Sequence, residues 1–327
     1  MKQQKFEALY KQEWESFRDY LNAREISLKL QTDVTGFTAE QFPKRYRKMC
    51  HYLAIAKERK YSYFLVEQLN DLVLRGHQHL YSLKKTRSRQ LIEFFVKDYP
   101  SLVRKEWKYV CVALALFYLS GGAMASITLV FPELIHSVFD QSQINQFEEM
   151  YNPEKRLKGR TRDSDTNLQM FGYYIGHNIG ISFQVFAGGL FLGLGTIFYL
   201  TYNGIIMGTV ASHLGSAGFS STFFPFVVGH ASFELTAIVI SGAAGLKLGF
   251  AIIAPGRNSR ADALKKAART SVKLVYGVIV MLLIAAFIEA FWSSGSVVGN
   301  TVKYTVGAGL WILVIAYFAF SGKTHGS

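Results

Sequence analysis

The sequence predicts an all-α protein in which an N-terminal helical domain precedes a polytopic α-helical membrane domain. Hydrophobic residues make up 50% of the 327 residues, and the mean hydropathy of +0.15 is high for a soluble chain and low for one embedded throughout. The long apolar segments begin at Trp107, whereas the residues before it are polar and amphipathic. We therefore expect a cytoplasmic helical domain over residues 1–106 and a membrane domain over residues 107–321.

The N-terminal domain carries the periodicity of a small helical bundle. Apolar side chains recur at steps of three and four residues, which places them on one face of a helix. The pattern continues to Tyr81, and a further piece ends at Pro100. We expect three or four packed helices with a basic outer surface. The predicted face of the first helix consists of Phe6, Leu9, Tyr10, Trp14, Phe17 and Leu21.

The charge and the cysteine content limit the partners and the kinds of site that we expect of this protein. The net charge is +13, and through Lys108 there are 22 Lys and Arg residues against 13 Asp and Glu residues. A basic domain next to a lipid bilayer predicts the cytoplasmic side and attraction to anionic headgroups. No nucleic-acid recognition motif accompanies this charge, so we expect no nucleic-acid partner. Cys50 and Cys111 fall in different predicted domains, which argues against a disulfide framework or a cysteine-based metal site.

The first predicted span covers residues 107–131. Trp107 suits the membrane interface, and Lys105 and Lys108 predict that this end is cytoplasmic. The N-terminus lacks the apolar segment of a cleavable signal peptide, so this span would itself direct insertion. Residues 132–168 contain seven acidic and five basic residues, which predicts an extracytoplasmic loop.

Glycine-rich spans follow this loop. Glycines four residues apart let helix backbones approach closely in lipid, and Gly204 and Gly208 have this spacing. Residues 204–218 would cover only about 21 Å, so they form either a short tilted span or half of a broken helix. Gly172, Gly176 and Gly180 share the same spacing. The five further predicted spans are residues 173–202, 204–218, 222–253, 274–292 and 304–320.

The loop charges fix the predicted topology. Residues 255–273 carry six basic residues against one acidic residue, which predicts a cytoplasmic loop. An odd number of crossings must separate it from the extracytoplasmic loop at residues 132–168. Three crossings give six spans in the inner membrane with both termini cytoplasmic. One crossing with a re-entrant hairpin is the alternative.

Ionisable and amide side chains lie inside these apolar spans. His230 and Glu234 are four residues apart, which places both on one helix face. Buried ionisable groups are costly in a membrane and face a bundle interior or a wet cavity. By depth, we expect His230, Glu234, Glu289 and Asn178 to converge in the outer half of the bundle. The structural alternatives are hydrogen bonds between helices for the ionisable groups and helix-end caps for Asn178 and Asn203.

Catalytic motifs are absent from the sequence. There is no Gly-x-Ser-x-Gly, no phosphate-binding glycine loop and no His-Glu-x-x-His. We therefore expect no enzymatic activity and no cofactor. His230 and Glu234 would supply two metal ligands, fewer than the three or four of a zinc site. A metal-dependent intramembrane hydrolase is accordingly a lesser alternative.

Several short motifs resemble the stage II sporulation protein M family. In the membrane domain these are Gly229–Glu234, Ile240–Leu246, Tyr202–Gly204 with Gly208, Asn178, and Ala285–Phe291. The N-terminal domain is similar to that of the long, non-sporulation members at Trp14, Tyr46, Arg47 and Leu69–His77. The resemblance makes Asn178, Asn203, His230, Glu234 and Glu289 the residues most like the family's motif positions.

The resemblance implies a bacterial membrane protein without an assigned biochemistry. Founding members help to hold peptidoglycan-degrading enzymes at the membrane during spore engulfment, and long members are thought to work beside membrane and ATPase partners. The leading hypothesis is therefore a non-enzymatic scaffold or partner in an envelope complex, and its small-residue faces would also fit a homo-oligomer. The second hypothesis is a transporter or channel that uses His230, Glu234 and Glu289. A cavity open to one side would favour transport, and a sealed bundle would favour the scaffold.

Overall fold

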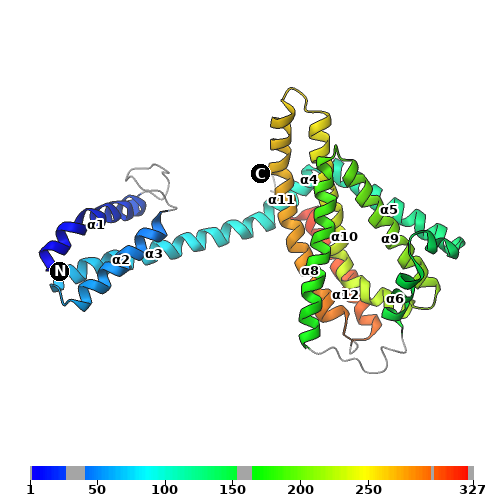
Figure 1. Cartoon of the computed structure of the whole chain (residues 1–327), viewed down its shortest axis with the longest axis horizontal. Helices are drawn as coiled ribbons and strands as arrows, with labels where there is room; N and C mark the ends of the chain where they lie inside the picture. Colours follow the sequence, from blue (N-terminus) through cyan, green and yellow to red (C-terminus); the bar gives the residue numbers. More distant parts are fainter. Residues whose placement is uncertain (1, 27–40, 153–163, 296–297, 323–327) are drawn as a thin grey trace. The chain divides into compact units, whose positions relative to one another are not determined.

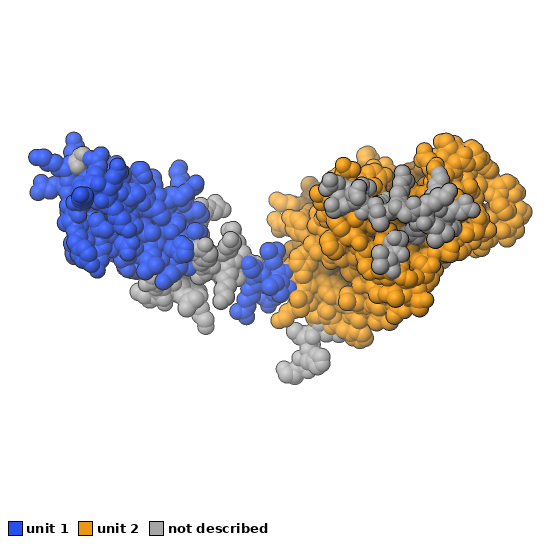
Figure 2. Space-filling view, turned by 90° about the horizontal axis from the view of Figure 1, so that it is seen from below, with its two compact units in different colours: residues 1–93 blue, residues 94–327 orange. Residues whose placement is uncertain are grey.

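The computed structural model describes residues 2–26, 41–152, 164–295 and 298–322. Within these ranges the secondary structure is helical and contains no strand, which confirms the predicted all-α polytopic fold. The chain divides into two compact units, residues 1–93 and residues 94–327, which Figure 2 colours separately.

The N-terminal unit consists of α1 (Gln3–Ile26), α2 (Phe42–Glu58) and α3 (Tyr63–Glu93). Its core is rich in aromatic side chains, and Phe6, Phe17 and Phe42 are fully buried there. The predicted face of α1 is largely correct, but Leu9 is 56% exposed and lies outside the core. The α2–α3 turn is fixed by Gln3, whose side chain hydrogen-bonds both the Oγ and the backbone N–H of Ser62 at 2.9 Å.

The membrane unit contains five helical segments that are long and apolar enough to cross a bilayer. They are α5 (Trp107–Val130), α9 (Leu194–Ser216), α10 (Ser220–Ile253), α11 (Arg260–Phe287) with the π-helix η4 (Ile288–Ser293), and α12 (Asn300–Phe320). The other elements are η1 (Phe94–Asp98), α4 (Tyr99–Lys105), η2 (Pro132–Ser137), α6 (Gln141–Tyr151), α8 (Ser164–Ala187) and η3 (Gly188–Leu190).

Helix α10 is the central element of this unit (Figure 1). It packs against α5, α8, α9, α11 and α12. Every residue from 237 to 245 is buried, and this segment is rich in alanine and glycine. Small side chains on a central helix allow the surrounding helices to approach it closely.

Side-chain hydrogen bonds define two ends of the membrane unit. At the α6 end, Thr222 Oγ1 donates to the carbonyl of Tyr151, and Asn300 Nδ2 donates to the carbonyl of Ser221. At the α4 end, Arg104 donates to the carbonyls of Phe318 and Ser321 at 2.7 Å each. The α4 end also contains an ion pair of 2.8 Å between Lys247 and Glu106.

The helix break in the glycine-rich region differs from its predicted position. Spans were expected at residues 173–202 and 204–218, but α8 ends at Ala187 and α9 runs unbroken from Leu194 to Ser216. The turn between them is formed by Leu192 and Gly193, whose φ angles are +55° and +81°. The half-helix interpretation of residues 204–218 is therefore wrong, and the re-entrant alternative stays a prediction. Helix α8 as a further crossing stays a prediction.

Other boundaries also shift. Helix α11 begins at Arg260, so most of the predicted loop 255–273 is helical and the predicted span 274–292 is only its second part. The compact units meet after Glu93 rather than after residue 106, because Tyr99 of α4 is buried in the membrane unit and its hydroxyl donates to the carbonyl of Leu274 at 3.3 Å. The predicted loop at 132–168 contains α6, whose N-terminus is closed by a capping box between Asp140 and Gln143. Residues 153–163 of that loop lie outside the described ranges.

The glycines that are spaced by four residues pack differently in α9 and in α8. Gly204 and Gly208 of α9 lie directly against Gly121 of α5, and a Cβ at Gly208 would collide with the carbonyl oxygen of Gly121. At Gly172, Gly176 and Gly180 of α8, a Cβ would meet no atom within 4 Å. Close glycine packing is therefore present on α9 and absent at these three described positions of α8.

Candidate functional site

The central helix α10 carries the first two residues of the site. Glu234 lies about 21 Å from the N-terminal end of α10 and about 28 Å from its C-terminal end, at 1.5 Å per residue. His230 lies one turn before it on the same face. Both groups therefore lie far from either end of a buried apolar helix.

The structure brings a third ionisable residue to this pair. One ligand atom from each of His230, Glu234 and Glu289 lies within 4.8 Å of the others, and His230 Nε2 is 4.0 Å from Glu234 Oε2. Glu289 comes from η4, where the helix widens to a π-helix and buries Glu289 and Ser293 together. Single π-helical turns often occur at functional sites.

His230 is enclosed by α10 and η4. Its side chain is 7% exposed, and its Nδ1 lies 3.4 Å from the hydroxyl of Ser293. The preceding residue is Gly229, where a Cβ would lie 2.7 Å from the ring of Trp292. Glycine is therefore required for η4 to lie this close to the histidine.

Lys303 of α12 is a buried cation, although it falls between the predicted spans 274–292 and 304–320. It is 2% exposed, and its Nζ donates to the carbonyls of Ser293 and Gly295 at 2.7 and 2.8 Å. Ser293 thus contacts both side chains. Its carbonyl accepts a hydrogen bond from Lys303, and its hydroxyl lies beside Nδ1 of His230. The available signal was a lone lysine beside an apolar span, but neither Ser293 nor Lys303 belonged to a recognised pattern.

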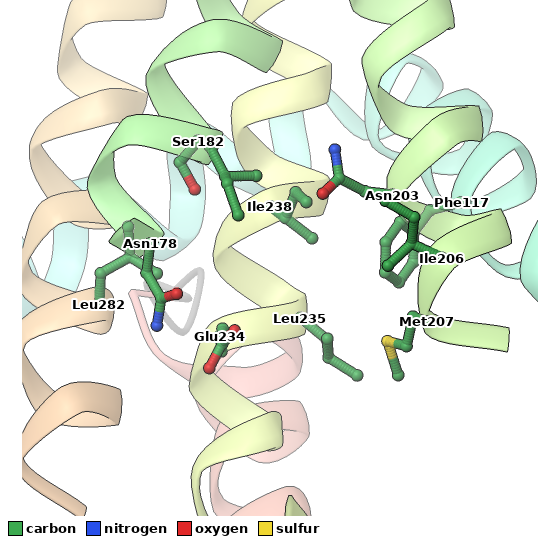
Figure 3. A pocket seen from close by; sticks show the side chains of 11 residues that line it. Phe117, Asn178, Ser182, Asn203, Ile206, Met207, Glu234, Leu235, Ile238 and Leu282 are labelled. Carbon is green, nitrogen blue, oxygen red and sulfur yellow. The ribbon is translucent and has the colours of Figure 1, made fainter. Parts of the chain in front are cut away.

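On its other side, Glu234 lines a cavity of about 170 Å³ among five helices. The Glu234 side chain stays 31% exposed because it borders this space. Neither His230 nor Glu289 is among the lining residues, so Glu234 is shared by the cavity and the cluster. The cavity is lined by Phe117, Asn178, Ile181, Ser182, Asn203, Ile206, Met207, Glu234, Leu235, Ile238 and Leu282 (Figure 3).

The two asparagines are not helix-end caps. Asn178 lies inside α8, is 5% exposed, and directs its side chain toward the space that Glu234 borders (Figure 3). Its buried amide lies beside the Glu234 carboxylate, and the two side chains interact. Asn203 lies inside α9, and its Nδ2 donates to the carbonyl of Tyr199 at 2.8 Å.

The cavity is lined mainly by apolar side chains, and its polar groups are Asn178, Ser182, Asn203 and Glu234. Carboxylate, amide and hydroxyl oxygens accept hydrogen bonds and can ligate a cation. The cavity has far more than the roughly 10–15 Å³ that one water molecule requires.

Comparison with known proteins identifies the family. Residues 110–294 match the family described as Stage II sporulation protein M, which is more than half of the chain. The chain belongs to the stage II sporulation protein M family. Residues 4–82 match a family described only as a domain of unknown function. No curated protein and no solved structure matches the chain.

The stage II sporulation protein M region covers most of the site. Asn178, Asn203, His230, Glu234 and Glu289 all fall inside residues 110–294, whereas Lys303 lies beyond the match. Together with the five apolar helices, this membership identifies a multi-pass membrane protein.

Proposed function

We propose that this protein is an inner-membrane transporter that binds a small polar or cationic solute in the cavity lined by Glu234. The observation that carries the proposal is a carboxylate that borders a cavity far from either end of a membrane helix. An ionisable group at this depth is costly, and such groups mark substrate or ion pathways in membrane proteins. The cavity also makes the bundle unlike the sealed one expected of a purely structural membrane domain.

The distribution of charge supports an orientation with both termini in the cytoplasm. Lys105, Lys108, Arg257 and Arg260 flank helices at the α4 end of the membrane unit. At the α6 end, η2 and α6 with its N-cap contain Glu133, Asp140 and Glu148. Basic residues near span ends are enriched on the cytoplasmic side.

A scaffold in an envelope complex is the second candidate function. The observation that favours it is the separate N-terminal unit, which has its own aromatic core and its own family match. Such a unit would recruit other membrane or envelope proteins, including an ATPase. Neither candidate role requires catalysis by this chain.

The first test is complementation of a deletion strain by Glu234→Gln and Ser182→Leu. The first variant removes the charge of the cavity and keeps the side-chain shape, whereas the second fills the cavity without changing the carboxylate. We expect both variants to lose at least about 90% of the complementing activity at normal expression. Glu133→Gln, at an exposed glutamate near the α6 end, is the matched control and should complement fully.

The opposite result is equally informative. If both cavity variants complement like the wild type, the transport proposal fails and the scaffold remains. Size-exclusion chromatography of the purified variants separates loss of folding from loss of function.

A further inference from the structure

The cluster of His230, Glu234 and Glu289 has the donor atoms of a metal site. It offers one imidazole nitrogen and two carboxylates from two separate helical segments, α10 and η4. Nitrogen and oxygen donors of this kind suit zinc, manganese and ferrous iron, whereas oxygen donors alone suit magnesium and calcium. The presence of the imidazole therefore favours a transition-metal ion.

Binding of a metal ion would draw the three donors closer together. Donors lie about 2.0–2.2 Å from zinc, so two donors on one tetrahedral ion are roughly 3.3–3.6 Å apart. His230 Nε2 and Glu234 Oε2 are 4.0 Å apart, and the three donors lie within 4.8 Å of one another. Binding therefore requires the side chains to move inward by up to roughly 1 Å.

The groups behind the histidine orient it for a metal. When Nδ1 donates its hydrogen to the Ser293 hydroxyl, Nε2 presents a lone pair toward Glu234. Metal-binding histidines commonly donate their second ring N–H in this way. Ser293 is held in turn by Lys303, whose ammonium group donates to the carbonyls of Ser293 and Gly295.

The cavity supplies a place for the remaining ligands. It borders Glu234, and Asn178 directs a buried amide toward the same space. Glu234 is the residue shared by the cluster and the cavity, so water entering the cavity would lie beside the carboxylate that would hold the ion. Three protein ligands leave one position on a four-coordinate ion for such a water.

We propose that His230, Glu234 and Glu289 bind one divalent transition-metal ion, of the zinc or manganese class, with a coordination position open to the cavity. This site goes beyond the transport proposal and does not depend on it. The ion is bound whether the cavity carries solutes or only holds water.

Metal content measured on the full-length protein tests this inference. The tag-free protein in detergent is stripped with EDTA, loaded with Zn²⁺ or Mn²⁺, desalted and analysed by mass spectrometry for metal. We expect about one equivalent in the wild type and at least a tenfold lower content in His230→Gln and Glu289→Gln. Because Trp292 lies against Gly229, loading should also change the intrinsic fluorescence of the wild type.

A second His–Glu pair provides the matched control. His213 and Glu148 lie 2.9 Å apart at the α6 end, outside the cluster. His213→Gln should retain about one equivalent of metal. A wild-type content below about 0.1 equivalent with both ions, or equal metal loss in His213→Gln and His230→Gln, would overturn the proposal.

The same experiments distinguish failure of the metal site from failure of the proposed transport function. If Glu234→Gln abolishes complementation while the wild type binds no metal, the transport proposal stands and the metal site fails. If one cluster variant does not fold, the other carries the test, since each removes a single ligand. Circular dichroism and size-exclusion chromatography establish that the variants are folded before their metal content is compared.

Discussion

The two units of this protein bury different kinds of side chain. The N-terminal unit has a core of large aromatic residues, among them Phe6, Phe17 and Phe42, each 0% exposed. The centre of the membrane unit is residues 237–245 of α10, where alanine, glycine and serine predominate and every residue is buried. The same chain therefore uses opposite residue sizes to build its two interiors.

The difference follows from the solvent of each unit. In water, burying a large aromatic side chain is strongly favourable because it removes a large apolar area from the solvent. In lipid the surroundings are as apolar as the core, so helices associate by close packing and hydrogen bonds instead. Large residues are consequently free to face the lipid, and Leu119, Ile312 and Phe320 of the membrane unit are each more than two-thirds exposed.

A similar contrast exists within α10 itself. Residues 241–245 are all small and allow close approach of neighbouring backbones, as at Gly245, which lies against the carbonyls of Val185 and Phe186. The segment around His230 and Glu234 instead carries polar groups and borders a cavity. The tight segment holds the bundle together, while the polar segment has room for a ligand.

Substitution of Phe17 tests the aromatic core and should have the largest effect. Phe17→Ala leaves a cavity beside Phe42, whose ring centroid is 5.3 Å away. We expect the free energy of unfolding of the N-terminal unit to fall by about 3–5 kcal/mol. Hydrogen exchange of the amides of α1 and α2 in the full-length protein measures this change. Phe64→Ala, at a 70% exposed phenylalanine, should change exchange little.

Leucine substitutions at two membrane glycines test the close-packing half of the comparison. Gly208→Leu forces α5 and α9 apart at Gly121, which should destabilise the membrane unit by at least about 2 kcal/mol. Gly176→Leu, where a Cβ has open space, should leave the thermal unfolding temperature in detergent within about 2 °C of the wild type. Equal effects at both sites would show that helix proximity does not determine stability here.

The smallest expected effect concerns pH and the N-terminal unit alone. Burial opposes ionisation of Glu13, but hydrogen bonds from Lys48 and Tyr52, both 3.0 Å long, outweigh it and lower its pKa. Because the folded pKa lies below the ordinary value of 4.5, this stabilisation is complete above pH 4.5 and is lost as pH falls through the folded pKa. Amide exchange in α1 should therefore accelerate on acidification relative to neutral pH, after correction for intrinsic rates.

The matched variant for this pH effect is Glu13→Gln. It should remove most of the acid-dependent part of the destabilisation and leave exchange at neutral pH slightly faster than in the wild type. An unchanged acid response in Glu13→Gln would assign the effect to other carboxylates.

Local properties of the sequence predicted some of the membrane helices and half of the site. Hydropathy depends on composition, so the α5 span was predicted within one residue and the end of α10 at Ile253 was correct. The spacing of His230 and Glu234 fixes their shared face by helix geometry alone. The family motifs and the predicted depth in the membrane indicated Glu289, but its proximity to His230 and Glu234 depends on how the helices pack.

Tertiary packing decided the remainder. Tyr202-Asn203-Gly204 has the residues of a turn, yet Asn203 bonds the carbonyl of Tyr199 within α9, and the glycines pack against α5. The chain turns instead at Leu192 and Gly193, where Gly193 lies against Gly249 of α10, a contact that depends on another helix. Burial of Lys303 likewise depends on carbonyls at the end of η4. The sequence determined what each helix can bury, and only the packing of α8, α9 and η4 around α10 decided which groups meet.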